Sequence, residues 1–300
     1  MFRAKISIKP PFDMKLSLKF ATACRFESEN DCREGRFHRL VDVNGIPILL
    51  TITTNGNIEK PTASIRWELP EDGRVGRAEV VRLARHIISA DLDLIPFYNK
   101  VSGKNKLAPV IRKFRGLKPI LTPSVYESAA WAIMGQQVNL NFAYTLKKRI
   151  ADKYGRVINL DGRAYQLFPD PDAIARARIA QLRAMQFSQR KAEYLIDLSK
   201  SVSGGMIKLE EMGRNGYNEA LECLLSVRGI GIWSANYILM RGAGHLDCLP
   251  LGDSGLHRAV RNLYNLKSAP DNEKVKKQAE SSAPYRSLYT LYLWYSLMSD

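Results

Sequence analysis

Asp253 is the residue whose surroundings most clearly suggest chemistry. It follows Gly252 and precedes residues 254–260, which have the apolar spacing of a helix, so we expect Asp253 to be the N-cap of that helix. The helix dipole and amide hydrogen bonds keep a carboxylate ionised at such a position. An ionised carboxylate can stabilise positive charge on a sugar ring and can orient or deprotonate water. Asp253 is therefore expected to be catalytic, with capping alone as the alternative.

Gly229 and Gly231 lie where two expected helices meet. The apolar pattern of residues 221–226 ends before them, and a second helical pattern begins after them. Glycine permits the positive φ of a tight turn and the close approach of another backbone. The first amides of the second helix are unpaired donors at the positive end of its dipole, which suits a phosphate oxygen. We expect a phosphate-backbone contact here, with a plain tight connection as the alternative. The expected contact residues are Arg228, Gly229, Gly231, Ile232 and Trp233.

Four aromatic residues are candidates for a pocket that receives a planar, electron-poor ring. Trp233 and Tyr237 stand four residues apart on the second helix, so they share one face and can form a wall together. Trp294 and Tyr295 on the expected terminal helix could supply further walls. The π electrons of such rings attract a cationic ring by about 0.5–2 kcal/mol per contact. Ordinary core packing is the alternative for all four.

The chain carries a net charge of +15, from 45 basic and 30 acidic residues among 300. This excess indicates a polyanionic partner, with nucleic acid first, an acidic membrane second and a bland surface surplus as the alternative. With 45% hydrophobic residues the chain is too apolar for disorder, and its length suggests about two domains. It has no apolar run of about 18 residues and no signal peptide at its start. We therefore expect a soluble protein that is not secreted and has no membrane partner.

The cysteines give no sign of a metal centre. Cys24, Cys32, Cys223 and Cys248 are far apart and lack the spacing of a zinc site or an iron–sulfur cluster. We expect free thiols in a reducing compartment, and no metal bound by side chains.

The first third of the chain is expected to be rich in strands. Residues 14–20 alternate between apolar and polar, which predicts a half-buried strand. Residues 46–54 and 58–69 flank an Asn-Gly dipeptide and predict a hairpin. Pro47 and Pro61 favour edge positions in this sheet.

Helices are expected in the rest of the chain. Residues 80–88 have helical spacing, and residues 100–118 combine Gly, Pro and Ser with basic side chains and no acid. The latter segment is expected to be an exposed connection between domains. Beyond Leu121 an Ala-rich, helical periodicity takes over.

The window around Asp253 resembles the helix-hairpin-helix DNA glycosylase superfamily. Members carry a Leu-Pro-Gly-Val/Ile-Gly hairpin and an aspartate about twenty residues later, which match residues 227–231 and Asp253. Arg228 stands where the family usually has proline. Residues 132–138 (AIMGQQV), 284–287 (PYRS) and 293–295 (LWY) extend the resemblance to the 3-methyladenine DNA glycosylase II (AlkA-like) branch over about residues 121–299.

The resemblance implies an α+β protein of two domains. Residues 1–117 would form an antiparallel sheet domain like the TATA-binding protein repeats, with a helix and a connecting segment, and residues 118–300 a helical HhH-GPD domain. Pocket residues of the family fall at all four aromatic positions. Gln137 falls where the family inserts a wedge into the DNA, with a polar residue at a helix end as the alternative. No cofactor is expected besides a structural Na⁺ or K⁺ ion, which the family places on backbone carbonyls. The matching carbonyls are those of Leu225, Val227 and Ile230.

The implied activity is a monofunctional DNA N-glycosylase that excises alkylated bases such as 3-methyladenine by base flipping, in base excision repair. Superfamily members that also cut the strand use a lysine two residues after the second glycine, and Trp233 stands there. An oxidised-base glycosylase of the 8-oxoguanine type and a non-catalytic DNA-binding protein are the alternatives. The expected partner is duplex DNA with a damaged base. The expected protein is a monomer in the cytoplasm, near the nucleoid, or in a nucleus.

Overall fold

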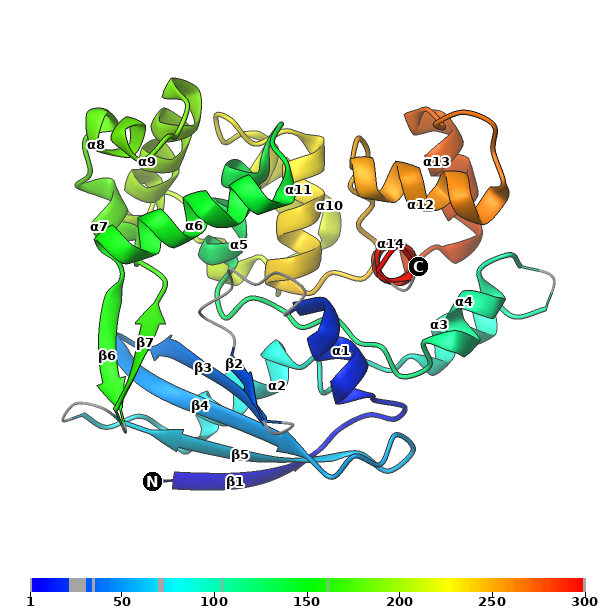
Figure 1. Cartoon of the computed structure of the whole chain (residues 1–300), viewed down its shortest axis with the longest axis horizontal. Helices are drawn as coiled ribbons and strands as arrows, with labels where there is room; N and C mark the ends of the chain where they lie inside the picture. The colour runs from blue at the N-terminus through cyan, green and yellow to red at the C-terminus, as the bar shows by residue number, and fades with distance from the viewer. Residues whose placement is uncertain are drawn as a thin grey trace.

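The computed structural model describes residues 2–21, 31–33, 36–69, 73–103, 105–160 and 162–298. Figure 1 shows a sheet layer with helices above it. The strands are β1 (Phe2–Ser7), β2 (Asp31–Arg33), β3 (Arg36–Val43), β4 (Ile46–Thr54), β5 (Thr62–Glu68), β6 (Arg156–Leu160) and β7 (Arg163–Leu167). The first helices are α1 (Met14–Ala21), α2 (Arg77–Ile87), α3 (Ile95–Lys100), α4 (Ala108–Lys113), α5 (Val125–Gly135), α6 (Leu140–Tyr154), α7 (Pro171–Ala175), α8 (Ile179–Ala184) and α9 (Gln189–Ser203). They are followed by η1 (Leu209–Glu211), α10 (Tyr217–Leu225), α11 (Ile232–Ile238), the π-helical η2 (Leu239–Ala243), α12 (Ser254–Tyr264), α13 (Asn272–Ala279), η3 (Glu280–Ser282) and α14 (Arg286–Ser296).

The first five strands form one antiparallel sheet in the order β1-β5-β4-β3-β2. One face packs on α1 and α2 around a core that includes Ile48, Ile52 and Ile65. The other face packs on the β6–β7 hairpin through Leu40, Leu49 and Ile158. The sheet is therefore covered on both faces, and the expected α+β fold with an antiparallel sheet is confirmed.

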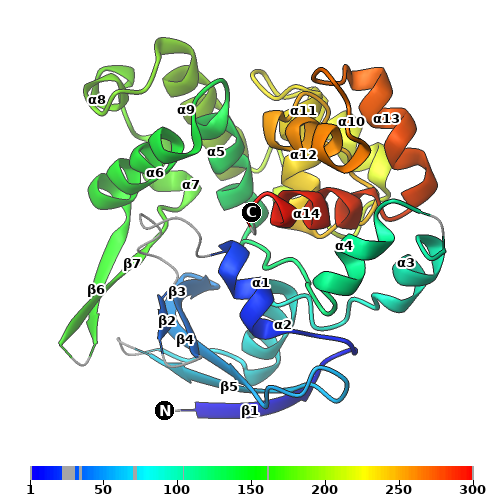
Figure 2. The ribbon, with the colours of Figure 1, turned by 45° about the vertical axis from the view of Figure 1, so that its right-hand side comes forward.

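The helices from α3 onward share a second hydrophobic core. In Figure 2 the green helices α5–α9 lie on one side and the yellow-to-red helices α10–α14 on the other, with α14 near the middle of the molecule. The largest side chains of this core include Tyr289, Tyr292 and Tyr295 of α14, each no more than 1% exposed. Among the described residues, no helix is long and apolar enough to cross a membrane. Cys223 and Cys248 are free thiols, whereas Cys24 and the side chain of Cys32 lie outside the described residues.

The strand expected at residues 14–20 is wrong, because α1 occupies this segment. The Asp13 side chain accepts a hydrogen bond from the Leu16 backbone N–H at 3.0 Å, as a residue before a helix does. Met14 and Leu18, four residues apart, are both buried. The sequence satisfies the alternation of a strand and the spacing of a helix at once, and the local cap together with the sheet behind it selects the helix.

The edge positions expected for the two prolines are also wrong, since β4 and β5 are inner strands. Pro47 pairs with Asp42 of β3, but β5 joins β4 only from Leu49 onward. Pro47 thus lies where β4 has one neighbour, so its missing N–H costs no bond to β5. Pro61 directly precedes β5 and lies outside the strand.

The segment 100–118 is not a bare connection. It contains α4, and Leu107, Ile111 and Leu117 are buried in the helical core. The boundary after residue 117 stays a prediction. The helix expected at residues 80–88 is confirmed as α2, and so is the helical character beyond Leu121. The β6–β7 hairpin was not expected there.

A buried group of three charges joins the sheet to the helices. Arg39 of β3 and Lys147 of α6 both bind one carboxylate oxygen of Glu127 on α5, at 2.5 and 3.0 Å. All three side chains are at most 8% exposed. Burial alone would raise the pKa of Glu127, but the two cations outweigh it and lower this pKa to about 2. The ionised Glu127 therefore ties β3 to α5 and α6, the two helices on one side of the cleft described below.

We predict that Glu127→Gln lowers the free energy of unfolding at pH 7 by about 3–5 kcal/mol, because it leaves two buried cations without their counter-charge. The pKa of Glu127 is lower in the folded than in the unfolded chain, so its contribution is present above pH ~4.3 and is lost as the pH falls toward 2. The difference in the free energy of unfolding between the wild-type protein and Glu127→Gln should therefore become smaller as the pH falls through that range. Urea unfolding followed by circular dichroism measures both effects.

The matched control is Glu59→Gln, which removes a half-exposed ion pair with Arg115. It should cost at most about 1 kcal/mol. Equal losses in the two variants would contradict a special role for the buried group.

Candidate active site

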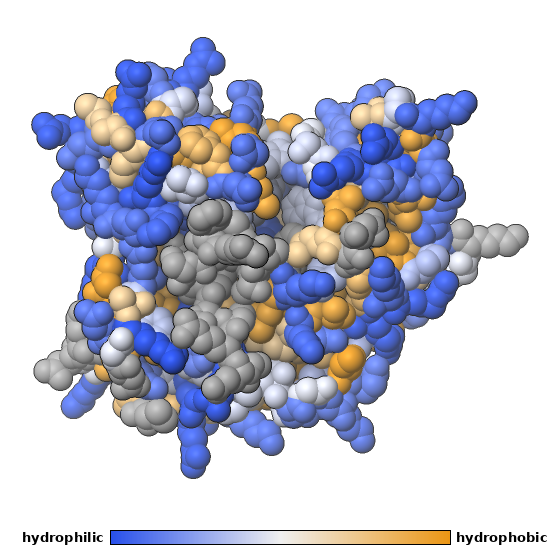
Figure 3. Space-filling model, in the orientation of Figure 1, coloured by the Kyte–Doolittle hydropathy of each residue, from blue (hydrophilic) through white to orange (hydrophobic). Residues whose placement is uncertain are grey.

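A cleft of about 1470 Å³ lies between α5 and α6 on one side and α11, α12 and α14 on the other. Figure 3 shows the surface hollowed between the two groups of helices. Asp253, Trp233, Tyr237 and Trp294, which the sequence predicts to be functional, all line this cleft. The fold therefore brings together side chains that are far apart in the sequence, from Trp233 to Trp294.

Asp253 is the N-cap of α12, as its position in the sequence predicts. Its Oδ1 accepts hydrogen bonds from the Leu256 backbone N–H at 2.7 Å and from the indole Nε1–H of Trp294 at 2.9 Å. Its Oδ2 accepts the indole Nε1–H of Trp233 at 3.2 Å. Three N–H donors thus point at the two oxygens, and accepting from all of them is the role of a carboxylate. The carboxylate is fixed in orientation and lies at the wall of the cleft.

The three aromatic rings beside Asp253 form one continuous surface. The rings of Trp233 and Tyr237 are 5.6 Å apart at an angle of 31°, as expected for positions i and i+4 of one helix. The rings of Tyr237 and Trp294 are 6.2 Å apart at 42°. All three are half-buried and line the cleft. Such a surface can stack on a planar heterocycle and attract a cationic one.

Tyr295 does not belong to this surface, which corrects its expected role in the pocket. It is 1% exposed, and its ring packs edge-on against Phe114 at 4.7 Å. Successive residues of a helix point about 100° apart. Because Trp294 faces the cleft, Tyr295 turns into the helical core.

The hairpin between α10 and α11 has the geometry that its glycines suggest. Gly229 has a φ of +90°, and a Cβ there would lie 2.3 Å from the ring of Tyr194, so only glycine fits. Gly231 is exposed and a Cβ there would meet no protein atom within 4 Å. Ile232 at the start of α11 is 45% exposed. Gly231 and Ile232 are therefore exposed at the start of α11, where a ligand can approach the end of the helix.

Arg228 has partners other than the expected phosphate. Its guanidinium binds Glu193 at 2.7 Å and Asp197 at 2.9 Å, and it lies 5.1 Å from the ring centre of Tyr194. All three partners belong to α9. Two carboxylates balance the charge of Arg228, so its observed role is to fasten the hairpin to α9.

The loop between α5 and α6 touches the hairpin. Gln136 Nε2 donates to the carbonyl of Gly229 at 2.7 Å and to Ser234 Oγ at 3.1 Å. The next residue, Gln137, is exposed, has a φ of +53° and lines the cleft. Gln136 thus holds the loop that presents Gln137, a contact that the sequence analysis missed.

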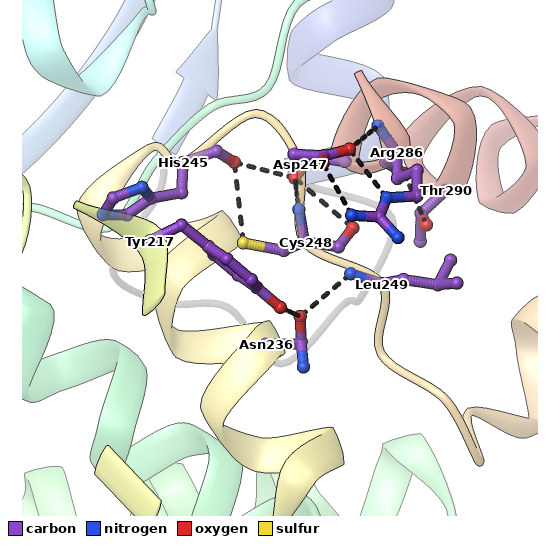
Figure 4. Close-up of polar contacts among 9 residues, drawn as sticks. Tyr217, Asn236, His245, Asp247, Cys248, Leu249, Arg286 and Thr290 are labelled. Carbon is purple, nitrogen blue, oxygen red and sulfur yellow. Dashed lines mark hydrogen bonds and ion pairs between the residues drawn. The ribbon is translucent and has the colours of Figure 1, made fainter. Parts of the chain in front are cut away.

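The loop that leads to Asp253 is held from two sides (Figure 4). On α11, Asn236 Oδ1 accepts the Leu249 backbone N–H at 2.9 Å and the Tyr217 hydroxyl at 2.8 Å. On the α14 side, Arg286 donates to both oxygens of Asp247 at 2.7 and 2.6 Å. These contacts fix residues 247–249 relative to the helices that carry the aromatic rings. Sequence reasoning missed them because Asp247 and Leu249 carry no local signal for partners so far along the chain.

The described residues of the cleft present a carboxylate beside the aromatic rings. Within the described residues, no group of His, Cys, Asp and Glu could hold a metal ion. The one lysine among the described residues that line the cleft is Lys147, and its ammonium binds Glu127.

Comparisons with known proteins agree with this picture. A model of the "HhH-GPD superfamily base excision DNA repair protein" family matches residues 130–284. A "DNA-3-methyladenine glycosylase" of Bacillus subtilis (strain 168) is 29% identical over 293 residues, which cover 96% of this chain and 95% of that protein. The solved "3-methyladenine dna-glycosylase from Archaeoglobus fulgidus" is similar with a TM-score of 0.82 at 27% identity, over 98% of this chain and 97% of that one. An 8-oxoguanine glycosylase/lyase of Clostridium acetobutylicum in complex with dsDNA shares the fold alone, with a TM-score of 0.75 at 16% identity over 100% and 98% of the two chains.

We predict that Asn236→Ala exposes the loop before Asp253 to faster hydrogen exchange. The variant leaves the buried Leu249 amide without an acceptor, which costs about 1–3 kcal/mol. The Leu249 amide should exchange faster, as measured by hydrogen–deuterium exchange. Tyr217→Phe is the control, because it removes a donor to the same Asn236 oxygen but leaves the Leu249 bond in place. Unchanged exchange at Leu249 in Asn236→Ala would contradict the anchoring role.

Proposed function

This chain belongs to the HhH-GPD superfamily of base excision DNA repair proteins, and from that premise we propose that it is a DNA N-glycosylase that excises alkylated bases such as 3-methyladenine from duplex DNA. The observation that carries the proposal is the Asp253 carboxylate, held by the indoles of Trp233 and Trp294 at the edge of an aromatic surface. A carboxylate and a base-sized aromatic surface in one cleft are what excision of a flipped base requires.

The pocket favours electron-poor bases. A base in the duplex stack must leave it before its glycosidic bond can be reached. Alkylation of a purine ring nitrogen gives the base a positive charge, and the rings of Trp233, Tyr237 and Trp294 attract that charge through their π electrons. Normal bases lack this attraction, so the aromatic surface supports selection of the alkylated base.

Asp253 then serves the hydrolysis itself. When the bond between C1′ of the sugar and the base nitrogen breaks, the bonding electrons leave with the base and the sugar becomes oxocarbenium-like. The Asp253 carboxylate stabilises this positive charge and orients a water molecule. The water oxygen forms the new bond to C1′, and the Asp253 carboxylate takes up the proton that the water loses. Because two indole N–H groups and the Leu256 amide already fix the carboxylate, it needs no rearrangement during the step.

The hairpin between α10 and α11 and the loop between α5 and α6 bind the DNA. The backbone amides of Gly231, Ile232 and Trp233 bind a phosphate oxygen at the N-terminus of α11. Gln137, exposed at the rim of the cleft, fills the gap left by the flipped base. Gln136 joins these two contacts by its hydrogen bond to Gly229.

The same proposal names the substrate of the protein and a monovalent cation that it would bind. The substrate is duplex DNA with a damaged base, bound by a single copy of the chain in a compartment that holds DNA. The carbonyls of Leu225, Val227 and Ile230 would hold a Na⁺ or K⁺ ion. The Val227 carbonyl accepts one hydrogen bond, from the Ile230 N–H at 3.0 Å, and its second lone pair suits a cation.

We predict that Asp253→Asn retains binding to lesion DNA but loses base release. Asparagine keeps an oxygen for the Leu256 amide, so the cap of α12 survives, while the negative charge is gone. The loss should amount to about 2.7–4 kcal/mol, or roughly 100- to 1,000-fold in rate. Single-turnover release of free base measures it. Base release at close to the wild-type rate would refute the mechanism.

We further predict that the product is an intact abasic site, formed without a covalent intermediate. A Schiff base needs a free amine near C1′, but Trp233 stands at the position of the lyase lysine and the ammonium of Lys147 binds Glu127. Borohydride added during the reaction should trap no protein–DNA adduct, and strand breaks should appear only after alkali or heat. A stoichiometric trapped adduct would overturn the monofunctional assignment.

A further inference from the structure

The cleft extends well beyond the aromatic surface beside Asp253. Its volume of about 1470 Å³ exceeds the roughly 300–1,000 Å³ of a typical small-ligand site. It continues along α5 and α6, where Trp131 and Tyr144 line it. These two rings take no part in the site described above.

One face of α5 brings Trp131 near the aromatic surface beside Asp253. Glu127, Trp131 and Gly135 follow one another at four-residue intervals, so they share one face of the helix, and all three line the cleft. A Cβ on Gly135 would lie 3.7 Å from Cη2 of Trp233. The backbone of Trp131 therefore lies four residues, about 6 Å along the helix axis, from Gly135, where α5 meets the Trp233 indole.

Trp131 and Tyr144 form a ring pair of their own. Their ring centres are 4.6 Å apart at an angle of 46°, and they come from two different helices. Both residues are half-buried, unlike the fully buried tyrosines of α14. Lys147 Nζ, held by Glu127, lies 5.9 Å from the ring centre of Trp131 and helps to fix it. The pair is thus a preformed aromatic surface inside the cleft.

Resting on the glycosylase function proposed above, we propose that Trp131 and Tyr144 form a second aromatic surface of the base pocket, which holds N-alkyl groups larger than methyl on a flipped purine. Such a group is apolar and must leave water when the base enters the cleft. Aromatic side chains offer large apolar area and favourable stacking for it. A methyl group brings much less apolar area into the cleft, so it depends less on these two rings.

The test compares duplexes that differ only in the lesion, N7-methylguanine or N7-benzylguanine, in single-turnover base release. The wild-type protein should release both bases. Trp131→Ala should slow release of the benzylated base by about tenfold and of the methylated base by less than about threefold. Tyr144→Ala should lower the ratio of benzylated to methylated base release in the same way. Trp131→Phe keeps an aromatic ring, so it should release the benzylated base at close to the wild-type rate.

Tyr154→Ala is the matched control, since Tyr154 is a half-buried tyrosine of α6 that does not line the cleft. It should leave the ratio of the two rates unchanged. An equal loss for both lesions in Trp131→Ala, no loss for either, or a parallel loss of binding to undamaged duplex would overturn the inference. If the wild-type protein releases methylated but not benzylated guanine, the inference fails and the proposed function stands. If it releases neither, the proposed function itself fails.

Discussion

One carboxylate held by two indole N–H groups organises the cleft. Asp253 accepts from Trp233 on α11 and from Trp294 on α14, so the two helices that carry the aromatic surface are joined through the charge that they surround. The third donor, the Leu256 amide, makes the same carboxylate the cap of α12. The position of the charge and the shape of the pocket are therefore set by the same few hydrogen bonds, and neither can shift without the other.

The surroundings keep this arrangement in place. Asn236 and Arg286 hold the loop before Asp253, and Gln136 holds the α5–α6 loop against the hairpin. Glu127, which lines the cleft, links α5 and α6 to the sheet. Such preorganisation matters because a carboxylate that already faces the developing positive charge stabilises the transition state without first having to reorient.

The sequence predicts those features that depend on local spacing. Trp233 and Tyr237 share a face because they are four residues apart, and Asp253 is a cap because a helix follows it directly. Contacts between residues that are far apart in the sequence cannot be predicted from local spacing. The acids that bind Arg228 lie more than thirty residues earlier on α9. Phe114, which packs against Tyr295, directly follows α4, far from Tyr295 in the sequence. The alternating pattern of α1 fits two structures equally, so only its contacts decide between them.

The identity of the released base tests the central claim most directly. Duplexes with a single N7-methylguanine, a single 8-oxoguanine or no lesion are incubated with excess wild-type protein, and the free bases are separated by chromatography. The account predicts release of the methylated base, with far less 8-oxoguanine and no normal base, because the aromatic surface beside Asp253 attracts a cationic ring. Release of 8-oxoguanine in preference to N7-methylguanine, or of no base at all, would contradict it.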